Sequence, residues 1–325
     1  MADYLVTGAA GFIGAALAER LATDGHRVTG LDNLNHAYDP RLKEWRLARL
    51  RALPGFTFHQ VDITDRAALE AALGDGRFEA VFNLAARAGV RPSLKHPALY
   101  FESNVAGALH LLDAARARGV AKFIQASTSS LYGAHNPRPF AEDADTSRPL
   151  SPYAASKGAA EMLCHAYHHL YGLDVTILRY FTVYGPAGRP DMSLFRFIQR
   201  LAEDRPLVVY GDGRQERDFT YRDDIVAGTV AALRPLGFAV INLGSDQPLA
   251  LLDVISRLER LLGRRARIEF RPEAPADVRA TWADIRRAGE LLGWQPRTSI
   301  EDGLERTVAW YLAERSWAST VETSD

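Results

Sequence analysis

The sequence predicts an α/β protein, with a doubly wound parallel sheet in its first part and a smaller, mostly helical C-terminal lobe. Two observations lead to this fold class. Short apolar segments alternate with helical segments through residues 1–180, which is typical of a parallel sheet with helices on both faces. The apolar segments also end in small or polar residues, and ligands of open α/β sheets bind beyond the carboxyl ends of the strands. We therefore expect one binding crevice at that edge.

The elements of the first part follow from this alternation in chain order. Strands are expected at residues 4–7, 27–31, 56–61, 79–84, 121–128 and 173–179. Helices are expected between them, at residues 15–22, 40–53, 65–73, 99–118 and 152–171.

The alternation weakens after residue 180, where a loop rich in glycine and proline follows. Helices are then expected at residues 193–202, 223–233, 249–262, 283–291 and 300–313, and strands at residues 207–210 and 239–243. The second of these strands is expected to rejoin the main sheet. We divide the chain into a sheet domain (residues 1–180), a lobe (residues 181–315) and a small polar tail (residues 316–325) that we expect to be disordered.

The composition argues against several classes of protein. The 325 residues carry 39 Lys and Arg against 40 Asp and Glu, a formal net charge of −1, so nothing favours a nucleic acid or an anionic membrane as partner. No apolar run approaches the roughly 18 residues of a membrane span, and the N-terminus lacks a leader-like apolar region. The single cysteine, Cys164, suits a reducing compartment. We therefore expect a cytoplasmic protein.

A glycine-rich loop follows the first expected strand and leads into the first helix. Its sequence is Gly8-Ala-Ala-Gly11-Phe12-Ile13-Gly14. Glycines at this spacing allow a tight turn and a bare backbone that a pyrophosphate can approach, with a helix N-terminus aimed at it. The loop therefore predicts a Rossmann-type site for a dinucleotide.

Acidic residues at the next strand ends refine this site. Asp32, followed by Asn33, closes the second strand, where a carboxylate can accept hydrogen bonds from both ribose hydroxyls and repel a 2′-phosphate. This favours NAD over NADP. Asp62, followed by Ile63, is expected to hold the adenine amine, although it could equally cap the following helix. Ala85 after the fourth strand is expected to border the same cofactor.

Tyr153 and Lys157 lie four residues apart in SPYAASK, so a helix places them on one face. A free tyrosine has a pKa of about 10, but a neighbouring ammonium and a bound nicotinamide cation favour the phenolate. The pair is therefore a candidate proton shuttle for a carbinol that loses a hydride. Thr128, at the end of the fifth strand, could bridge substrate and tyrosine. The alternative is an ordinary polar pair on an amphipathic helix.

Five segments together resemble the extended short-chain dehydrogenase/reductases, specifically the NAD-dependent nucleotide-sugar epimerases and dehydratases. They are VTGAAGFIG, NLAA at residues 83–86, STSS with LYG, YxxxK, and RYFTVYGP at residues 179–186. The resemblance implies that Thr128, Tyr153 and Lys157 are the catalytic residues, that residues 1–180 bind NAD and that residues 181–315 bind a nucleotide sugar. It also implies a homodimer in which helices 99–118 and 152–171 form a four-helix bundle.

The residues after Thr128 narrow the reaction within this family. Dehydratases of the family carry Asp-Glu there, and nucleotide-sugar decarboxylases commonly carry a glutamate at the second position, whereas this chain has Ser129 and Ser130. Without a carboxylate for elimination, the oxidised sugar is expected to take its hydride back. This favours an epimerase.

The loop Gly188-Arg-Pro-Asp-Met192 resembles that of UDP-glucuronate 4-epimerases, as do AGVRPS at residues 88–93 and LDNLN at residues 31–35. By that resemblance Arg189 faces the carboxylate of the substrate, since a guanidinium matches a carboxylate bidentately. Thr182, Ser129 and Ser130 would add neutral donors. The alternative for Arg189 is a solvated loop residue.

Two further residues are assigned to the nucleotide by the same resemblance. Arg217, in ERDFTYRDD, would grip the diphosphate, and Asp277, in ADVRATWAD, would contact the ribose. Related hexose epimerases often carry an arginine three residues before that aspartate, where this chain has Ala274. The sequence departs from the family pattern there.

The implied reaction has no net redox change. Tyr153 removes the 4-hydroxyl proton while C4 gives a hydride to NAD, and the 4-ketosugar turns over before the hydride returns, converting UDP-glucuronate to UDP-galacturonate. Arg189 would keep the β-keto acid from losing CO2. The alternatives are a UDP-glucose or UDP-N-acetylglucosamine 4-epimerase, then a UDP-glucuronate decarboxylase, then a non-catalytic dinucleotide-binding protein.

One cluster has spacing that could bind a metal, namely Cys164, His165, His168 and His169 on the helix of Tyr153. The hydride chemistry requires no metal. We therefore expect packing roles for these residues and no metal site.

Overall fold

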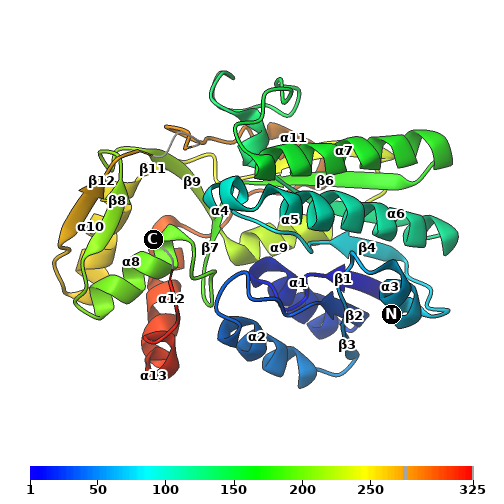
Figure 1. Ribbon diagram of the computed structural model, residues 1–325, viewed down its shortest axis with the longest axis horizontal. Helices are drawn as coiled ribbons and strands as arrows, with labels where there is room; N and C mark the ends of the chain where they lie inside the picture. Colours follow the sequence, from blue (N-terminus) through cyan, green and yellow to red (C-terminus); the bar gives the residue numbers. More distant parts are fainter. Residues whose placement is uncertain (274–276, 324–325) are drawn as a thin grey trace.

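A computed structural model describes residues 1–273 and 277–323 of the chain. Figure 1 shows a parallel sheet covered by helices on both faces, beside a smaller C-terminal lobe that contains α8, α10 and α12. The predicted fold class is therefore confirmed. Within the described residues, none of the helices has the length and apolar character needed to span a membrane.

The main sheet has seven strands in the order β10-β6-β5-β4-β1-β2-β3, and every pairing is parallel. The strands are β1 (Asp3–Thr7), β2 (Arg27–Asp32), β3 (Phe56–Gln60), β4 (Ala80–Asn83), β5 (Lys122–Thr128), β6 (Asp174–Tyr180) and β10 (Phe238–Leu243). The chain thus returns to the main sheet at β10, next to β6. The strand order reverses between β1 and β4, which is where open α/β sheets form a ligand crevice.

Helices cover both faces of this sheet. One face carries α1 (Phe12–Thr23), α9 (Arg222–Ala231) and α11 (Arg286–Leu292), and α2 (Arg41–Arg51) packs beside α1. The other face carries α3 (Arg66–Leu73), α6 (Gly107–Ala117) and α7 (Pro152–Tyr171). Successive strand residues point to opposite faces, so each face builds a separate apolar core.

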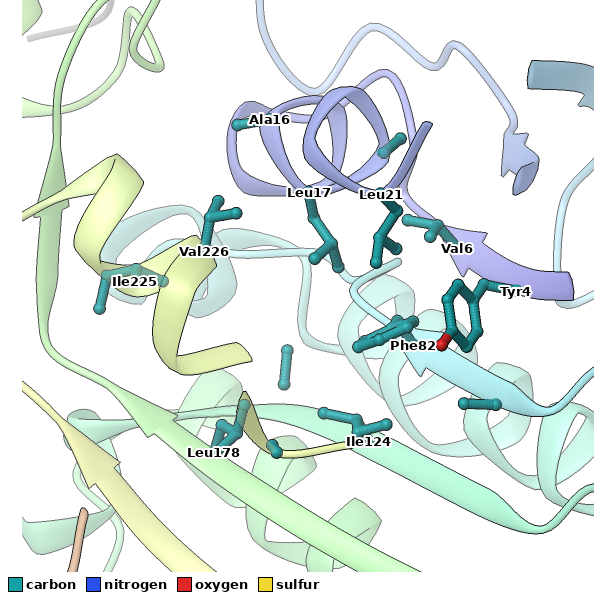
Figure 2. Packing of buried hydrophobic residues seen from close by; sticks show 14 of the residues in the cluster. Tyr4, Val6, Ala16, Leu17, Leu21, Phe82, Ile124, Leu178, Ile225 and Val226 are labelled. Atoms are coloured by element: carbon teal, nitrogen blue, oxygen red, sulfur yellow. The ribbon is translucent and has the colours of Figure 1, made fainter. Parts of the chain in front are cut away.

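Figure 2 shows the core between the sheet and α1. Strand residues Tyr4, Val6, Phe82, Ile124 and Leu178 meet Leu17 and Leu21 of α1 and Ile225 and Val226 of α9. Leu17 is fully buried there, and burying a leucine side chain stabilises a fold by about 1.5–3 kcal/mol. This packing holds the glycine-rich loop, because the loop joins β1 directly to α1.

The expected helix of residues 99–118 is broken into three pieces in the structure. They are α5 (Pro97–Phe101), a π-helical turn (Glu102–Ala106) and α6, and they follow the short α4 (Val90–Lys95). The π-turn places Asn104 so that its side chain bonds the backbone of Arg87 and, at 2.9 Å, the hydroxyl of Ser156 on α7. Single π-turns inside helices often occur at functional sites, and this one ties the loop after β4 to the helix of Tyr153.

The C-terminal lobe contains two small sheets that the sequence predicted only in part. The first pairs β8 (Leu207–Tyr210) with β12 (Ile268–Arg271), and the second contains β7 (Thr182–Tyr184), β9 (Glu216–Tyr221) and β11 (Pro248–Ala250). Helices α8 (Ser193–Ala202), α10 (Leu251–Leu262) and α12 (Ile300–Ala313) pack on them around a core of their own. Strand β9, which carries Arg217, was not predicted, because its sequence is polar.

The end of the chain differs from the expected disordered tail. After the short helix α13 (Arg315–Ala318), Val321 is buried among apolar residues. The side-chain amide of Gln199 donates to the carbonyls of Ala318 and Val321, at 3.0 and 2.9 Å. The expectation is therefore wrong for residues 316–323, because a buried amide and an apolar contact fix this segment, while residues 324–325 lie outside the described residues.

Candidate active site

A cavity of about 450 Å³ lies at the carboxyl ends of the main-sheet strands, next to the C-terminal lobe. Every site residue predicted from the sequence lines it. They are Gly8, Gly11, Phe12, Ile13, Gly14, Asp32, Asn33, Asp62, Ile63, Ala85, Thr128, Ser129, Ser130, Tyr153, Lys157, Thr182, Arg189, Arg217 and Asp277. The fold therefore brings together residues that are up to about 270 positions apart, from Gly8 to Asp277, although their individual roles remain predictions.

The glycine loop is too tight for side chains. Gly8 has a φ of +68°, in the left-handed region that glycine adopts readily. A Cβ atom at Gly14 would lie 2.1 Å from the carbonyl oxygen of Gly8, and one at Gly11 would lie 2.9 Å from it. The bare backbone at the N-terminus of α1 thus fits the cradle that a pyrophosphate requires.

Asp32 is buried at the end of β2. Its carboxylate accepts hydrogen bonds from the backbone N–H groups of Ala10, at 3.2 Å, and Leu34, at 2.8 Å. The ammonium of Lys43, from α2, lies 3.4 Å away and only 6% of its side chain is exposed. Lys43 lines the same cavity, although it was not among the predicted site residues.

Asp62 lies beside Asn33, whose side-chain amide donates to it at 2.7 Å. Burial raises the pKa of Asp62, but hydrogen bonds from Thr64 and Asn33 outweigh it and hold this pKa below its usual value. The alternative role as helix cap is wrong, because Asp65 caps α3 by accepting from the N–H of Ala68 at 3.0 Å. Asp62 is left facing the cavity as a charged acceptor.

Tyr153 and Lys157 project from the first turns of α7, which begins at Pro152 and is preceded by the cap residue Ser151. The Ser151 hydroxyl caps the helix by accepting from the N–H of Ala154 at 3.2 Å, and proline is well tolerated at the first helical position. Thr128 ends β5 opposite them, and its hydroxyl accepts from the N–H of Ser130 at 3.1 Å. The local sequence thus fixes both sides of the candidate catalytic group.

The electrostatics of Tyr153 differ from the expectation. Burial raises the pKa of Tyr153 above its usual value, opposed by its hydrogen bond with Thr128 and by the positive charge of Arg189. Burial also lowers the pKa of Lys157 to about 8, opposed by Glu161. In the protein alone, desolvation therefore outweighs the hydrogen bond with Thr128 and the charge of Arg189, and the phenol is not pre-ionised.

Glu161 explains how Lys157 keeps much of its charge. It lies one turn further along α7 and accepts from Arg179 Nε and Nη2, at 3.1 and 2.7 Å, and from the hydroxyl of Ser127. Arg179 also bonds the hydroxyl of Tyr132, at 3.1 Å. This buried network links β5, β6 and α7 and holds Glu161 in place next to Lys157.

Arg189 lines the cavity and is not a solvated loop residue. Its guanidinium binds the carboxylate of Asp191 with two nitrogens, one of them Nε at 3.0 Å, and donates to the carbonyl of Ala88 at 3.3 Å. Burial lowers the pKa of Arg189, but the charge of Asp191 and its hydrogen bond oppose this effect, and the pKa is raised above its usual value. The sequence did not indicate that Asp191 already occupies this guanidinium.

A second tyrosine supports Tyr153. The ring of Tyr100, from α5, meets that of Tyr153 edge to face with centroids 6.1 Å apart, and its hydroxyl donates to the carbonyl of Ala88 at 3.3 Å. Burial raises the pKa of Tyr100, so this residue acts as a neutral phenol. No local signal in the sequence pointed to it.

Arg217 lines one end of the cavity, and Arg91 lies close to it outside the lining. Arg91 of α4 pairs with Asp277 at 2.6 Å and stacks on Tyr210 at 3.8 Å. Burial lowers the pKa of Arg217, and the charge of Arg91 lowers it further, against the opposing Asp277. Mutual repulsion of two cations is relieved by an anion, so this end fits a diphosphate. Ala274 lies outside the described residues.

The cysteine–histidine cluster is used for packing. Cys164 is buried, and burial raises the pKa of its thiol. His165 meets Phe238 edge on at 5.0 Å, and His168 bonds the carbonyl of Leu173 at 2.9 Å. In residues 1–273 and 277–323, no three His, Cys, Asp or Glu side chains are grouped to hold a metal ion.

Comparisons with known proteins agree with this geometry. The model of the NAD dependent epimerase/dehydratase family matches residues 4–244. A UDP-glucuronate 4-epimerase from Thermodesulfobacterium geofontis is 53% identical over 311 residues, which cover 95% of this chain and 96% of that protein.

Solved structures agree as well. The UDP-glucuronic acid 4-epimerase of Bacillus cereus, in complex with UDP-glucuronic acid and NAD, is 40% identical with a TM-score of 0.89, over 96% of this chain and 99% of that one. The UDP-glucose 4-epimerase of Thermotoga maritima, with UDP-glucose, is 32% identical with a TM-score of 0.89 over the same shares. The predicted resemblance is confirmed, and with it NAD as the family's cofactor. The chain belongs to the NAD-dependent epimerase/dehydratase family.

Proposed function

We propose that this protein is a UDP-glucuronate 4-epimerase that forms UDP-galacturonate. The observation that carries the proposal is Arg189, a partly buried guanidinium that lines the cavity and acts electrostatically on Tyr153. An acidic sugar could place its carboxylate there while its 4-hydroxyl meets the tyrosine. The similarity to UDP-glucuronate 4-epimerases supports the same substrate.

The residues present fit NAD. The glycine loop would take the pyrophosphate, Asp32 the ribose hydroxyls and Asp62 the adenine amine, with Asn33, Ile63 and Ala85 lining the site. NAD, when bound, would accept a hydride from C4 of the sugar and later return it.

Tyr153 acts as the base for the 4-hydroxyl proton, and Thr128 bonds its hydroxyl. Because burial disfavours the phenolate, ionisation of Tyr153 depends on cations brought close to it. Arg189 is one, and Lys157 is positioned to stabilise the proton transfer from the same helix face. We therefore expect Tyr153 to remove a proton only when cofactor and substrate are bound.

Ser129 and Ser130 determine the fate of the oxidised sugar. Hydroxyls at these positions offer no carboxylate to remove water from the 4-ketosugar. Thr182, the first residue of β7, adds a third neutral donor to the same wall of the cavity. Return of the hydride to the opposite face then inverts C4.

Arg189 would meet the substrate carboxylate and hold its charge, which disfavours loss of CO2 from the β-keto acid. Arg217 and Arg91 would bind the diphosphate, and Asp277, already paired with Arg91, would contact the nucleotide ribose. The nucleotide diphosphate is thereby held while the ketosugar turns.

One observation favours a second candidate, a UDP-glucose 4-epimerase. Asp191 satisfies Arg189 without any substrate carboxylate, so a neutral sugar could also be accepted. Turnover of UDP-glucuronate, UDP-glucose and UDP-N-acetylglucosamine, measured separately, decides between them. The proposal predicts the highest kcat/KM for the uronate. A preference for UDP-glucose would refute it.

We also propose a homodimer built through α5, α6 and α7. Large apolar side chains on α5 and α7 are exposed, namely Leu99, Phe101, Met162, Leu170 and Tyr171. A helical face of this kind is suited to a second copy. Light scattering after gel filtration should give twice the mass of the chain, 35.9 kDa, and a monomer would contradict the proposal.

We also propose that the chain divides near residue 180 and that the protein is cytoplasmic. The first is supported by the separate core of the C-terminal lobe. The second is supported by a single, buried thiol.

A further inference from the structure

We propose that Arg46 is a positioning residue, and through it a determinant of specificity, because it ties the cofactor's glycine loop to the loop that carries Arg189. This inference rests on the proposed function, since it assigns Arg189 to a substrate carboxylate. Arg46 itself belongs to α2 and is far in sequence from both loops.

The environment of Arg46 is unusual for a charged residue. Helix α2 has the sequence RLKEWRLARLR, yet Arg46 is only 4% exposed. Burying a guanidinium costs several kcal/mol unless its donors are satisfied. A solvent-facing position on the same helix, such as that of Arg49, would avoid this cost.

Three groups of acceptors satisfy the donors of Arg46. Its Nη1 donates to the carbonyl of Ala10, at 3.1 Å, and to the hydroxyl of Tyr38, at 2.8 Å. Its Nε and Nη2 both donate to the carbonyl of Ala187, at 3.2 and 2.6 Å, and Nη2 also reaches Gly188 at 3.3 Å. None of these acceptors is a carboxylate, so Arg46 holds backbone segments in place and does not form a buried ion pair with them.

The two backbone targets belong to the two halves of the site. Ala10 lies inside the glycine loop, between Gly8 and Gly11. Ala187 and Gly188 directly precede Arg189 in the loop after β7. One rigid, planar guanidinium therefore spans the predicted pyrophosphate cradle and the predicted carboxylate contact.

The loop before Arg189 needs this support. Ala187 is buried and has a φ of +54°, in the left-handed region that is unfavourable for a residue with a Cβ. Two hydrogen bonds from Arg46 to its carbonyl hold it there. Tyr38 adds a second link, because its ring lies 5.7 Å from the guanidinium of Arg46 and 6.0 Å from that of Arg189.

Loss of Arg46 should therefore release Arg189 while leaving the diphosphate end of the site intact. The test compares R46M and R46K with R49M in the holoenzyme. R49M is a matched control, since Arg49 lies on the same helix with 57% of its side chain exposed. The affinities for UDP and UDP-glucuronate are measured by calorimetry, and the products of UDP-glucuronate turnover by chromatography with mass detection.

For R46M we expect about tenfold weaker binding of UDP-glucuronate, the size of one lost charge-assisted contact, with UDP binding changed less than about twofold. A larger fraction of product should have lost CO2. R46K should lie between R46M and the wild type, and R49M should match the wild type. If R46M does not fold, the R46K comparison carries the test.

Equal weakening of UDP and UDP-glucuronate would mean that Arg46 only stabilises the fold, and would overturn this role alone. Unchanged UDP-glucuronate binding in both Arg46 variants would overturn it too. A wild-type protein that does not turn over UDP-glucuronate would instead overturn the proposed function, and this role with it.

Discussion

The pairing of Arg189 with Asp191 leads to a prediction about charge in the cavity. The side chains are 21% and 18% exposed, so the pair is partly shielded from water. Replacing Arg189 with methionine removes the predicted partner of the substrate carboxylate. It also leaves the Asp191 carboxylate unpaired, with the same sign of charge as the substrate. R189M should therefore be harmed by two separate effects.

Their sizes can be set from the geometry. A charge-assisted contact shielded from water contributes about 1.5–3 kcal/mol, which corresponds to about 10- to 100-fold in kcat/KM. Repulsion between the two carboxylates, at an effective dielectric constant near 20, adds on the order of 1–2 kcal/mol. The second part vanishes when Asp191 is also neutralised.

The assay is kcat/KM for UDP-glucuronate in the wild type, R189M, D191N and the double variant R189M/D191N. We expect the double variant to recover about tenfold of the activity that R189M loses. UDP affinity, set at the far end of the cavity, serves as the control and should change little. A double variant as impaired as R189M, or more so, would refute the reasoning that Asp191 acts as an opposing charge.

Three further predictions concern single residues. K157M should abolish activity yet raise the free energy of unfolding of the nucleotide-free protein at pH 7 by about 3 kcal/mol, because the pKa of Lys157 falls from 10.5 to about 8 on folding. The cost of burying the charge of Lys157 is full below pH 8 and fades towards pH 10.5. A difference between K157M and the wild type in urea unfolding that stays constant from pH 7 to 10 would contradict this prediction. D32A should weaken NAD and favour NADP in calorimetry, since Lys43 then faces a 2′-phosphate without its counter-charge, and an unchanged NAD preference would exclude this role of Asp32. Y153F should lower kcat by about 10²–10⁴-fold with UDP-glucuronate affinity nearly kept, and a small loss of kcat would remove Tyr153 as the base.

Local signals in the sequence were enough for the glycine loop, the strand ends and the helix of Tyr153. The turn at Gly8, the cap at Ser151 and the i,i+4 spacing of Tyr153 and Lys157 depend on neighbours along the chain. The apolar strands follow from their own pattern, because a parallel sheet buries both faces. The predicted side chains at the ends of the main-sheet strands then meet at one edge by topology alone.

Contacts between distant segments could not be predicted in this way. Arg46 and Lys43 belong to a helix whose sequence looks solvated, and their acceptors come from Ala187 and Asp32. The pKa of Tyr153 depends on burial, which only the folded chain sets, so the effect expected from Lys157 and the nicotinamide cation was incomplete. Val321 is fixed by Gln199, more than a hundred residues earlier.

Strand β9 shows a further limit of pattern reading. Its residues alternate poorly, since Glu216, Arg217 and Asp218 are all charged. Asp218 is nevertheless buried, where it accepts hydrogen bonds from the N–H and hydroxyl of Ser245 and from the N–H of Ala283. A carboxylate satisfied by backbone donors from distant loops cannot be told from a solvated one in the sequence.

The proposed reaction requires that the hydride leaves and returns within one site. Its most direct test is incubation of the purified protein with UDP-glucuronate in D2O, without added NAD, followed by mass detection and NMR of the product. We predict UDP-galacturonate with no deuterium on carbon, formed by a retained cofactor. Deuterium on the sugar ring would mean inversion through a carbanion, and a product lighter by CO2 would mean that the site does not protect the β-keto acid. Either result would contradict hydride return within a protected site.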